Sequence, residues 1–230
     1  MTMEIRDAEP GDAGFVGWVM LTALDIPADS RFNKPEVWKR EDILYSWTRT
    51  RVAVIDGRPV GALISYPGEE YARLRIHTWE LIFGQPEEPE ADAKLDAGTD
   101  SHSEKDTDTG AETTDIDADA GPDTEPTVSA DAKPRTIEEE ALMYDLETFP
   151  GEYYLDSLAV LPEFRGQGIG RALLLDGVAK GRQAGFERVT LIVDVDKPKN
   201  ITLYESLGFV RDETISFFGH QYYRMHFAWR

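Results

Sequence analysis

The sequence has no cysteine among its 230 residues. That absence excludes disulfide bonds, thiolate metal sites and a cysteine nucleophile. Apolar runs of the roughly 18 residues that cross a bilayer are also missing. The first residues, which include Glu4, Arg6 and Asp7, lack the apolar stretch of a secretion signal. We therefore expect a cytoplasmic protein that does not associate with membranes.

Basic residues are scarce as well. The chain has 24 Lys and Arg against 44 Asp and Glu, which gives a formal net charge of −20. Binding to nucleic acid independently of sequence needs a surplus of cations that neutralises phosphates, so we expect no such partner. The spacing of the histidines resembles no metal-ligand motif and predicts no metal site; they are His77, His102, His220 and His226.

Aromatic residues are absent from residues 85–135, where sixteen Asp and Glu stand against four Lys and Arg. This stretch carries −12 of the net charge and has too few large apolar residues to offset the entropy of an ordered chain. The composition predicts a disordered, acidic, low-complexity insertion in one domain that spans residues 1–230. A folded subdomain and an acidic arm that binds a basic partner are the alternatives.

Hydrophobic periodicity and turn residues predict a mixed α/β fold. Asp56-Gly57 lies between two apolar runs and is a strong hairpin signal. In the N-terminal half we expect a strand at 3–7, a helix at 15–23, a helix at 35–48, strands at 51–56 and 60–66, and a helix at 71–83. In the C-terminal half we expect a helix at 137–146, a strand at 151–161, a helix at 168–183, a strand at 188–195, a helix at 199–207, and strands at 210–217 and 221–229.

A glycine-rich loop, Arg165-Gly166-Gln167-Gly168-Ile169-Gly170, separates the expected strand at 151–161 from the next helix. Alternating glycines allow a sharp turn that directs several backbone N–H groups at one point, and the helix N-terminus adds a positive dipole. Such a loop can bind a pyrophosphate. A dinucleotide fingerprint would need a third glycine where Arg171 stands, and the Gly-Lys-Ser/Thr of a nucleotide triphosphate loop is absent.

The segment from Leu158 to Gly170 resembles the acetyl-CoA signature of GNAT acetyltransferases, Gln/Arg-x-x-Gly-x-Gly/Ala. The segment from Asn200 to Phe209 resembles the second signature of that superfamily, in the expected order. The resemblance implies a central, mixed, mostly antiparallel and twisted sheet, flanked by helices, in which a central pair of strands splays apart. It also implies acetyl-CoA as cosubstrate, and the acidic insertion departs from the compact family domain.

Through this resemblance the strand residues Leu158, Ala159 and Val160 are expected to pair with the pantetheine arm, and Arg165 to Gly170 to hold the pyrophosphate. Arg171 could screen phosphate charge. Tyr204 matches the position of the acid that protonates the leaving thiolate, and Asn200 would orient the cofactor or cap its helix. The complete set of expected cofactor residues is Leu158, Ala159, Val160, Arg165, Gly166, Gln167, Gly168, Ile169, Gly170, Arg171, Asn200 and Tyr204.

The expected reaction is direct attack of a neutral primary amine on the thioester, so a base or a water chain must remove a proton. Asp156 is the first candidate because a carboxylate among apolar strand residues is costly to bury without a task. Glu152 and Asp194 are the alternatives. We expect an N-acetyltransferase whose acceptor is a small molecule, peptide or protein, as a monomer or homodimer. The rival hypothesis is a non-catalytic CoA-binding module with an acidic partner-binding arm.

Overall fold

The computed structural model describes residues 2–84, 146–217 and 219–229. All of them belong to one compact unit. The expected insertion at 85–135 and nearly all of the expected helix at 137–146 lie outside the described residues. Leu146 is described, and it is not helical.

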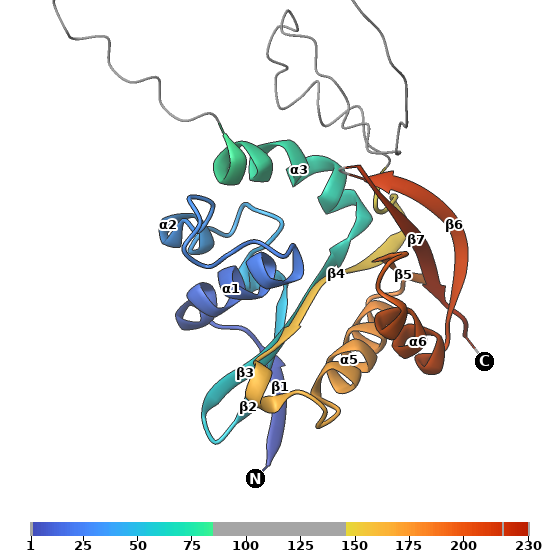
Figure 1. The fold of residues 1–230 in the computed structure, drawn as a ribbon, viewed down its shortest axis with the longest axis horizontal. Coiled ribbons are helices and arrows are strands. Elements are labelled where there is room, and N and C mark those ends of the chain that lie inside the picture. Colours follow the sequence, from blue (N-terminus) through green and yellow to red (C-terminus); the bar gives the residue numbers. More distant parts are fainter. Residues whose placement is uncertain (1, 85–145, 218, 230) are drawn as a thin grey trace, which may run out of the picture. The chain divides into compact units, whose positions relative to one another are not determined.

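Within the described residues, seven strands form one sheet in the order β1-β2-β3-β4-β5-β7-β6 (Figure 1). Their bounds are β1 Met3–Asp7, β2 Thr50–Ile55, β3 Arg58–Pro67, β4 Glu152–Val160, β5 Arg188–Asp194, β6 Phe209–Phe217 and β7 His220–Phe227. Among these strands β4 and β5 pair in parallel and every other pair is antiparallel. The expected mixed, mostly antiparallel sheet is confirmed.

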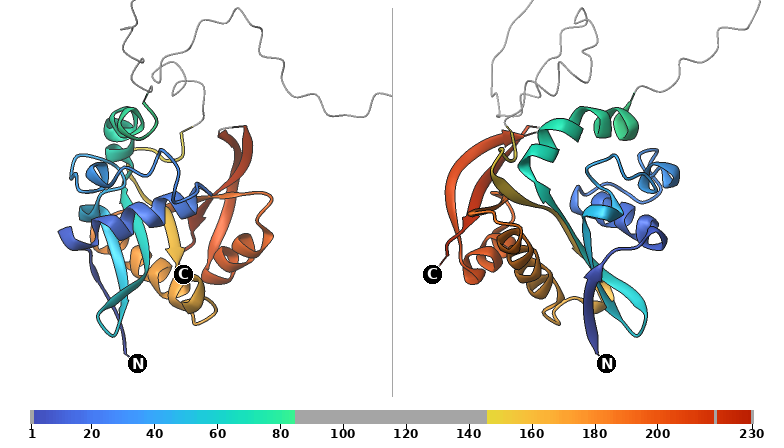
Figure 2. Two further views of the ribbon diagram at one scale, coloured as in Figure 1. Left: turned by 60° about the vertical axis from the view of Figure 1, so that its left-hand side comes forward. Right: turned by 180° about the vertical axis from the view of Figure 1, so that it is seen from behind.

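Helices cover both faces of the sheet (Figures 1 and 2). Successive residues of β2 point to opposite faces, as the strand period of two requires. Val52 joins a core with α1, α2 and α3, whereas Ala53 joins a core with α5 and α6. The bounds of the helices are α1 Ala13–Ala23, α2 Pro35–Trp38, α3 Gly68–Phe83, α5 Ile169–Gln183 and α6 Pro198–Leu207. None of these helices has the length and apolar character that a bilayer span needs.

The expected hairpin between β2 and β3 turns at Asp56 and Gly57, with φ values of 51° and 79°. Both residues therefore adopt the left-handed conformation that a tight two-residue hairpin turn requires. The hairpin pairs β3 with β2, and the other edge of β3 pairs with β4.

The prediction of a helix over 35–48 was wrong, because α2 ends at Trp38. The reason is the burial of consecutive residues Ile43, Leu44, Tyr45 and Ser46, all at most 5% exposed. A helix would turn part of such a run toward solvent. The segment instead packs against α3, where the Thr78 hydroxyl accepts a hydrogen bond from the Leu44 amide at 2.9 Å.

Helix α5 lies very close to the sheet because of its two internal glycines. A Cβ at Gly177 would lie 2.6 Å from a methyl carbon of Leu63, and a Cβ at Gly181 would lie 2.7 Å from the Tyr153 ring. Glycine costs an α-helix about 1 kcal/mol relative to alanine, and here it allows the close approach. The middle and the C-terminal part of α5 are thereby held against the sheet.

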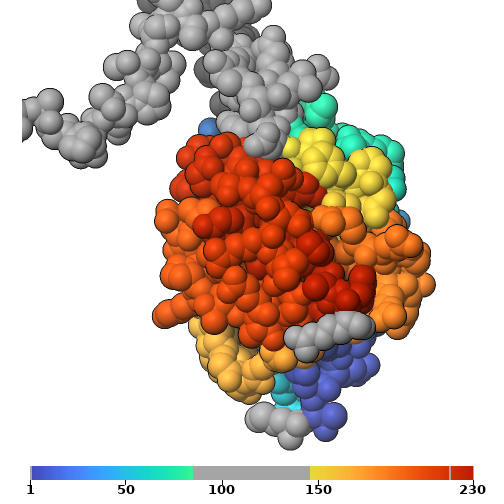
Figure 3. All heavy atoms as spheres, turned by 90° about the vertical axis from the view of Figure 1, so that its right-hand side faces the viewer, coloured from blue at the N-terminus to red at the C-terminus, as the bar shows by residue number. Residues whose placement is uncertain are grey.

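Strands β6 and β7 form much of the face toward the viewer in Figure 3. Phe217, at the end of β6, contacts Trp79 of α3 with ring centroids 6.0 Å apart. The C-terminal hairpin therefore contacts the helix that covers the N-terminal half of the sheet.

Candidate functional site

The parallel strands β4 and β5 separate partway along their length. Their pairing ends with Tyr154 opposite Thr190. Beyond that pair, within the described residues, β4 continues beside β3 alone and β5 beside β7 alone. The expected splayed central pair is confirmed, and it leaves backbone groups on one side of β4 without a strand partner.

A β-bulge lies on β4 at the same place. Leu155 pairs with Ser65 and Leu158 pairs with Leu63, so β4 has one residue more than β3 over this interval. Bulges re-aim side chains and occur often next to active sites. The Tyr66 hydroxyl donates to Asp156 within the bulge, on the face covered by α1, α2 and α3.

The glycine loop follows β4 and opens toward solvent. Gly166 and Gly168 have φ values of 76° and 81°, and a Cβ at either position would have no neighbour within 4 Å. Gly168 is also the residue before α5, so the free N–H groups of the first helical turn point out of this loop. A Cβ at Gly170 would lie 3.7 Å from Leu158 and 3.9 Å from Val160. The loop and the splayed part of β4 are therefore contiguous.

Two arginines, Arg165 and Arg171, lie in this loop and directly after it. Arg165 donates through Nε to the Val160 carbonyl at 3.0 Å. Arg171 and Lys199 are exposed and form no ion pair within the described residues, whereas Lys197 pairs with Asp25 at 2.5 Å. Ile169 is 2% exposed and packs in the α5 core, so only its backbone can serve a ligand.

The other expected cofactor residues differ in accessibility. Leu158 and Val160 are partly buried and lie against the α5 core, while Ala159 faces the opposite core. Gln167 is exposed, and its amide lies 3.5 Å from the Glu163 carbonyl. Asn200 is exposed in the first turn of α6, and it does not cap the helix, because Lys197 is the residue before the first turn.

Tyr204 lies on α6, half-buried against the α5 core. Its ring contacts Phe209 edge to face, with centroids 6.1 Å apart. Burial raises the pKa of its phenol to about 12. The hydroxyl therefore keeps its proton throughout the physiological range, as an acid that protonates a thiolate must.

A buried carboxyl that the sequence did not reveal lies beside Asp156. Glu147 is 7% exposed and accepts hydrogen bonds from the hydroxyls of Tyr154 at 2.6 Å and Tyr71 at 3.2 Å. Burial and the negative charge of Asp156 raise the pKa of Glu147 to about 8. Burial also raises the pKa of half-buried Asp156, while hydrogen bonds from Ser157 and Tyr66 lower it.

The Glu147 side chain lies in a cluster of tyrosine rings. Tyr66 and Tyr154 are neighbours on paired strands, with ring centroids 5.8 Å apart. No motif could have identified Glu147, because it lies in irregular chain just before β4 and its partners come from distant elements. The rings of the cluster are those of Tyr45, Tyr66, Tyr71 and Tyr154.

Glu152, the second candidate base, lies in a network of hydrogen bonds at the start of β4. Its two oxygens accept hydrogen bonds from Arg224 at 2.9 and 2.7 Å, and further bonds from Arg188 and the Phe149 amide. These donors engage both oxygens of Glu152, so we carry Asp156 forward as the candidate base. The third candidate, Asp194, accepts a hydrogen bond from the Asp196 amide at 2.8 Å at the end of β5.

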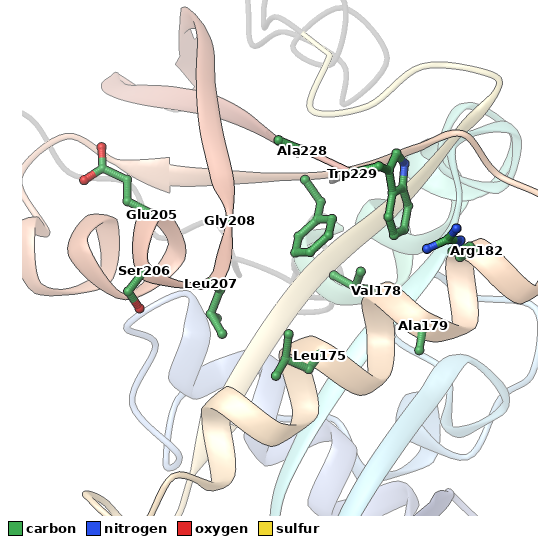
Figure 4. Close-up of a pocket in the computed structure, with 11 residues that line it drawn as sticks. Leu175, Val178, Ala179, Arg182, Glu205, Ser206, Leu207, Gly208, Ala228 and Trp229 are labelled. Carbon is green, nitrogen blue, oxygen red and sulfur yellow. The ribbon is translucent and has the colours of Figure 1, made fainter.

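A groove of about 500 Å³ lies elsewhere, between the C-terminal half of α5, the end of α6 and the chain after β7 (Figure 4). Leu175 and Val178 line one wall and Leu207 the other, and Trp229 lies at one end. The glycine loop is at the opposite end of α5, so the groove is separate from it. The described residues contain no group of three or more His, Asp or Glu that could hold a metal ion.

Comparison with known proteins agrees with this geometry. Residues 137–209 match the family model of the acetyltransferase (GNAT) family. Mycothiol acetyltransferase of Thermobispora bispora is 49% identical over 61 residues, which are 26% of this chain and 20% of that protein. The chain therefore matches about a fifth of the length of this curated relative.

Two solved structures share the fold over nearly the whole chain. A crystal structure of an acetyltransferase has a TM-score of 0.61 and 21% identity, and covers 97% of this chain and 98% of that one. An N-acetyltransferase from Staphylococcus aureus Mu50 has a TM-score of 0.60 and 17% identity, with 97% and 99% covered. The expected fold is confirmed, and residues 137–209 are similar to the GNAT acetyltransferase family.

Proposed function

Because this chain carries a GNAT acetyltransferase segment at residues 137–209 within the fold of solved acetyltransferases, we propose that it transfers an acetyl group from acetyl-CoA to a primary amine. The observation that carries the proposal is the opening between β4 and β5 beyond Tyr154 and Thr190, contiguous with the open glycine loop. This combination offers unpaired strand backbone and a phosphate cradle side by side.

The residues at this opening suit coenzyme A. Backbone N–H groups of the loop and the first turn of α5 can bind the pyrophosphate, since no side chain fills the space at Gly166 and Gly168. The cations of Arg165, Arg171 and Lys199 can offset the phosphate charge. The open side of β4 from Leu158 to Val160 can pair with the amide groups of the pantetheine arm. Bound acetyl-CoA would supply an activated thioester.

Two chain residues would then move protons. Asp156 faces the α1 to α3 side of the splay and would accept the proton of the acceptor ammonium, which leaves a neutral amine free to attack. Tyr204 lies on the α5 and α6 side and would donate its proton to the departing thiolate. The splay connects these two faces, so the acceptor and the thioester could approach from opposite sides of the sheet.

Acceptor identity does not follow from the mycothiol relatives, because the match covers only 61 residues. Helices α1, α2 and α3 cover the side of the splay on which we expect the acceptor. The acceptor class that we propose is therefore a primary amine.

The test combines binding with turnover. Purified protein is titrated with acetyl-CoA in a calorimeter and is then mixed with acetyl-CoA and a panel of primary amines while thiol release is followed. We expect saturable binding and release that depends on the amine. Absence of both would refute the proposal, and binding without release for any amine would support a non-catalytic CoA-binding protein.

A further inference from the structure

Glu147 has no assigned role in the chemistry above, although it lies buried beside the proposed base. We propose that Glu147 is a positioning residue that holds a proton next to Asp156, so that the carboxyl pair carries one negative charge when the acceptor binds. Asp156 is then the member that receives the proton of the acceptor. This inference rests on the proposed acetyl transfer and adds a second carboxyl to it.

The first argument is geometric. Tyr154 holds Glu147 through its hydroxyl, and Tyr66 holds Asp156 through its own. These two tyrosines are register partners on β4 and β3, so both carboxyls are fixed to one pair of neighbouring side chains. Two carboxylates that share a buried site cannot both ionise easily, and their protons leave in two steps.

The second argument concerns which carboxyl keeps the proton. Glu147 is almost completely buried, whereas Asp156 is half-buried at the opening between β4 and β5. Asp156 also accepts a hydrogen bond from the adjacent Ser157 hydroxyl at 2.7 Å. Each carboxyl accepts two hydroxyl hydrogen bonds, so solvent contact decides: it favours an ionised Asp156, and deep burial favours a neutral Glu147.

The third argument is that other charges around Glu147 do not cancel its burial. Arg75 of α3 lowers the pKa of Glu147, but burial and the charge of Asp156 outweigh it. No Lys or Arg forms an ion pair with Glu147 within the described residues. The groups that face Glu147 are Tyr71 and Arg75 from α3, Tyr154 and Asp156 from β4, Tyr66 from β3, Tyr45 from the 43–46 segment and Tyr222 from β7.

The turn that carries Glu147 is fixed in place. The Thr148 hydroxyl and the Phe149 amide both donate to Glu152 at 3.1 Å. A Cβ on Gly68, at the start of α3, would lie 1.9 Å from the Phe149 carbonyl oxygen, so the turn packs directly against that helix. Glu152 therefore helps to position Glu147, which gives it a role other than that of the base.

The proton transfer balances simply. The acceptor ammonium loses one N–H bond, and that proton forms an O–H bond on the Asp156 carboxylate. The nitrogen keeps the electron pair for its attack on the thioester. Glu147 exchanges no proton in this step, and it only prevents a second negative charge from raising the proton affinity of Asp156.

A ligand-free experiment tests the pair. Thermal unfolding of wild type and Glu147→Gln is compared between pH 4 and 9. The carboxyl of Glu147 ionises near 4.5 when unfolded and near 8 when folded, so the folded chain binds more protons between these values. The stability of wild type relative to the variant should fall across that window and stay constant above it. A difference independent of pH would overturn the pair.

Two further variants locate the coupling. Asp156→Asn removes a charge that raises the pKa of Glu147, so the window should end at a lower pH. Tyr154→Phe removes a hydrogen bond that lowers this pKa, so the window should end at a higher pH. Absence of the Asp156→Asn shift would show that Glu147 ionises independently of Asp156 and would overturn the pair.

Kinetics test the positioning role. At pH 7 Glu147→Gln should keep kcat/KM within about threefold of wild type, because both side chains are neutral there. Above pH 8 the ratio of the wild-type kcat/KM to that of the variant should rise about tenfold, because ionised Glu147 strengthens the base. Taking the ratio cancels the titration of the acceptor amine. Glu80→Gln, on the exposed side of α3, is the control and should leave the ratio constant.

The outcomes separate the two proposals. A folded Glu147→Gln without activity at pH 7, or a constant ratio from pH 6 to 10 beside active wild type, would overturn the role of Glu147 and leave acetyl transfer intact. Absence of transfer by wild type with every amine would refute the proposed function, while the unfolding window would still decide whether the two carboxyls share a proton.

Discussion

Arg224 of β7 and Glu152 of β4 form a buried ion pair, with side chains 5% and 8% exposed and a shortest contact of 2.7 Å. The pair crosses β5, which lies between the two strands. Arg224 also lies over the Phe149 ring, with its guanidinium carbon 4.4 Å from the ring centroid. One ion pair therefore connects the C-terminal hairpin to the turn that carries Glu147.

This pair predicts a large loss of stability when one partner is removed. Glu152→Ala leaves a buried guanidinium poorly paired, which should lower the free energy of unfolding by about 3 kcal/mol. Glu213, the other partner of Arg224, is 58% exposed. Glu213→Ala should therefore lower the free energy of unfolding by less than about 1 kcal/mol. Urea unfolding of both variants measures the difference. Equal effects would contradict the assignment of Glu152 to structure.

Tyr204→Phe tests the proposed acid. Shape and burial are nearly preserved, so acetyl-CoA affinity should change little while kcat falls by about 10² to 10⁴. Because the pKa of Tyr204 is about 12, its ionisation should produce no decline in the pH–rate profile below about pH 11. Tyr223→Phe on β7 is the control and should retain kcat. Full activity of Tyr204→Phe would mean that water supplies the proton.

Two substitutions at Gly170 distinguish the effect of a side chain's charge on acetyl-CoA binding from the effect of its size. A Cβ there meets Leu158 and Val160 at ordinary contact distances, so Gly170→Ala should fold and bind acetyl-CoA within about tenfold of wild type. Gly170→Asp places a carboxylate where a pyrophosphate should bind, and it should abolish binding in calorimetry. Gly168 is a less clean choice because its positive φ also strains any other residue. Equal affinities of the two Gly170 variants would contradict the cradle.

Gly181→Ala tests the close approach of α5 to the sheet. The new Cβ would lie 2.7 Å from the rigid Tyr153 ring and 2.9 Å from Val189. Overpacking costs about 1–3 kcal/mol and exceeds the gain in helix propensity of about 1 kcal/mol. Gly14→Ala, with nothing within 4 Å, should be neutral or stabilising. Chemical denaturation of both measures this, and a stabilised Gly181→Ala would disprove tight packing.

Deletion of residues 88–132 tests the acidic segment. Residues 1–85 and 135–230 belong to one compact unit that excludes it, and the segment has no aromatic residue. The shortened chain should therefore unfold cooperatively and bind acetyl-CoA as the full chain does. Loss of cooperative unfolding, measured by calorimetry, would show that the segment is part of the folded core.

Local sequence signals predicted most of the helices and strands and the glycine loop. The Asp56-Gly57 turn and the glycines from Gly166 to Gly170 act through the backbone conformation of the residues themselves, so their spacing alone reveals them. The segment from Ile43 to Ser46 misled the helix prediction for the opposite reason. Its burial on all sides depends on contacts with α3, which no local pattern encodes.

The sequence by itself determined the loop between β4 and α5, the two-signature resemblance and the candidates Asp156 and Tyr204. Only the tertiary structure decided which carboxyls lie together. It joined Glu152 to Arg224, 72 residues away, and brought Glu147 to Tyr71, 76 residues away. The physical reason is that the proton affinity of a carboxyl depends on its burial and on neighbouring charges, and here the neighbours come from α3, β3, β4 and β7. Their proximity follows from the packing of the sheet and helices, and no spacing along the chain records it.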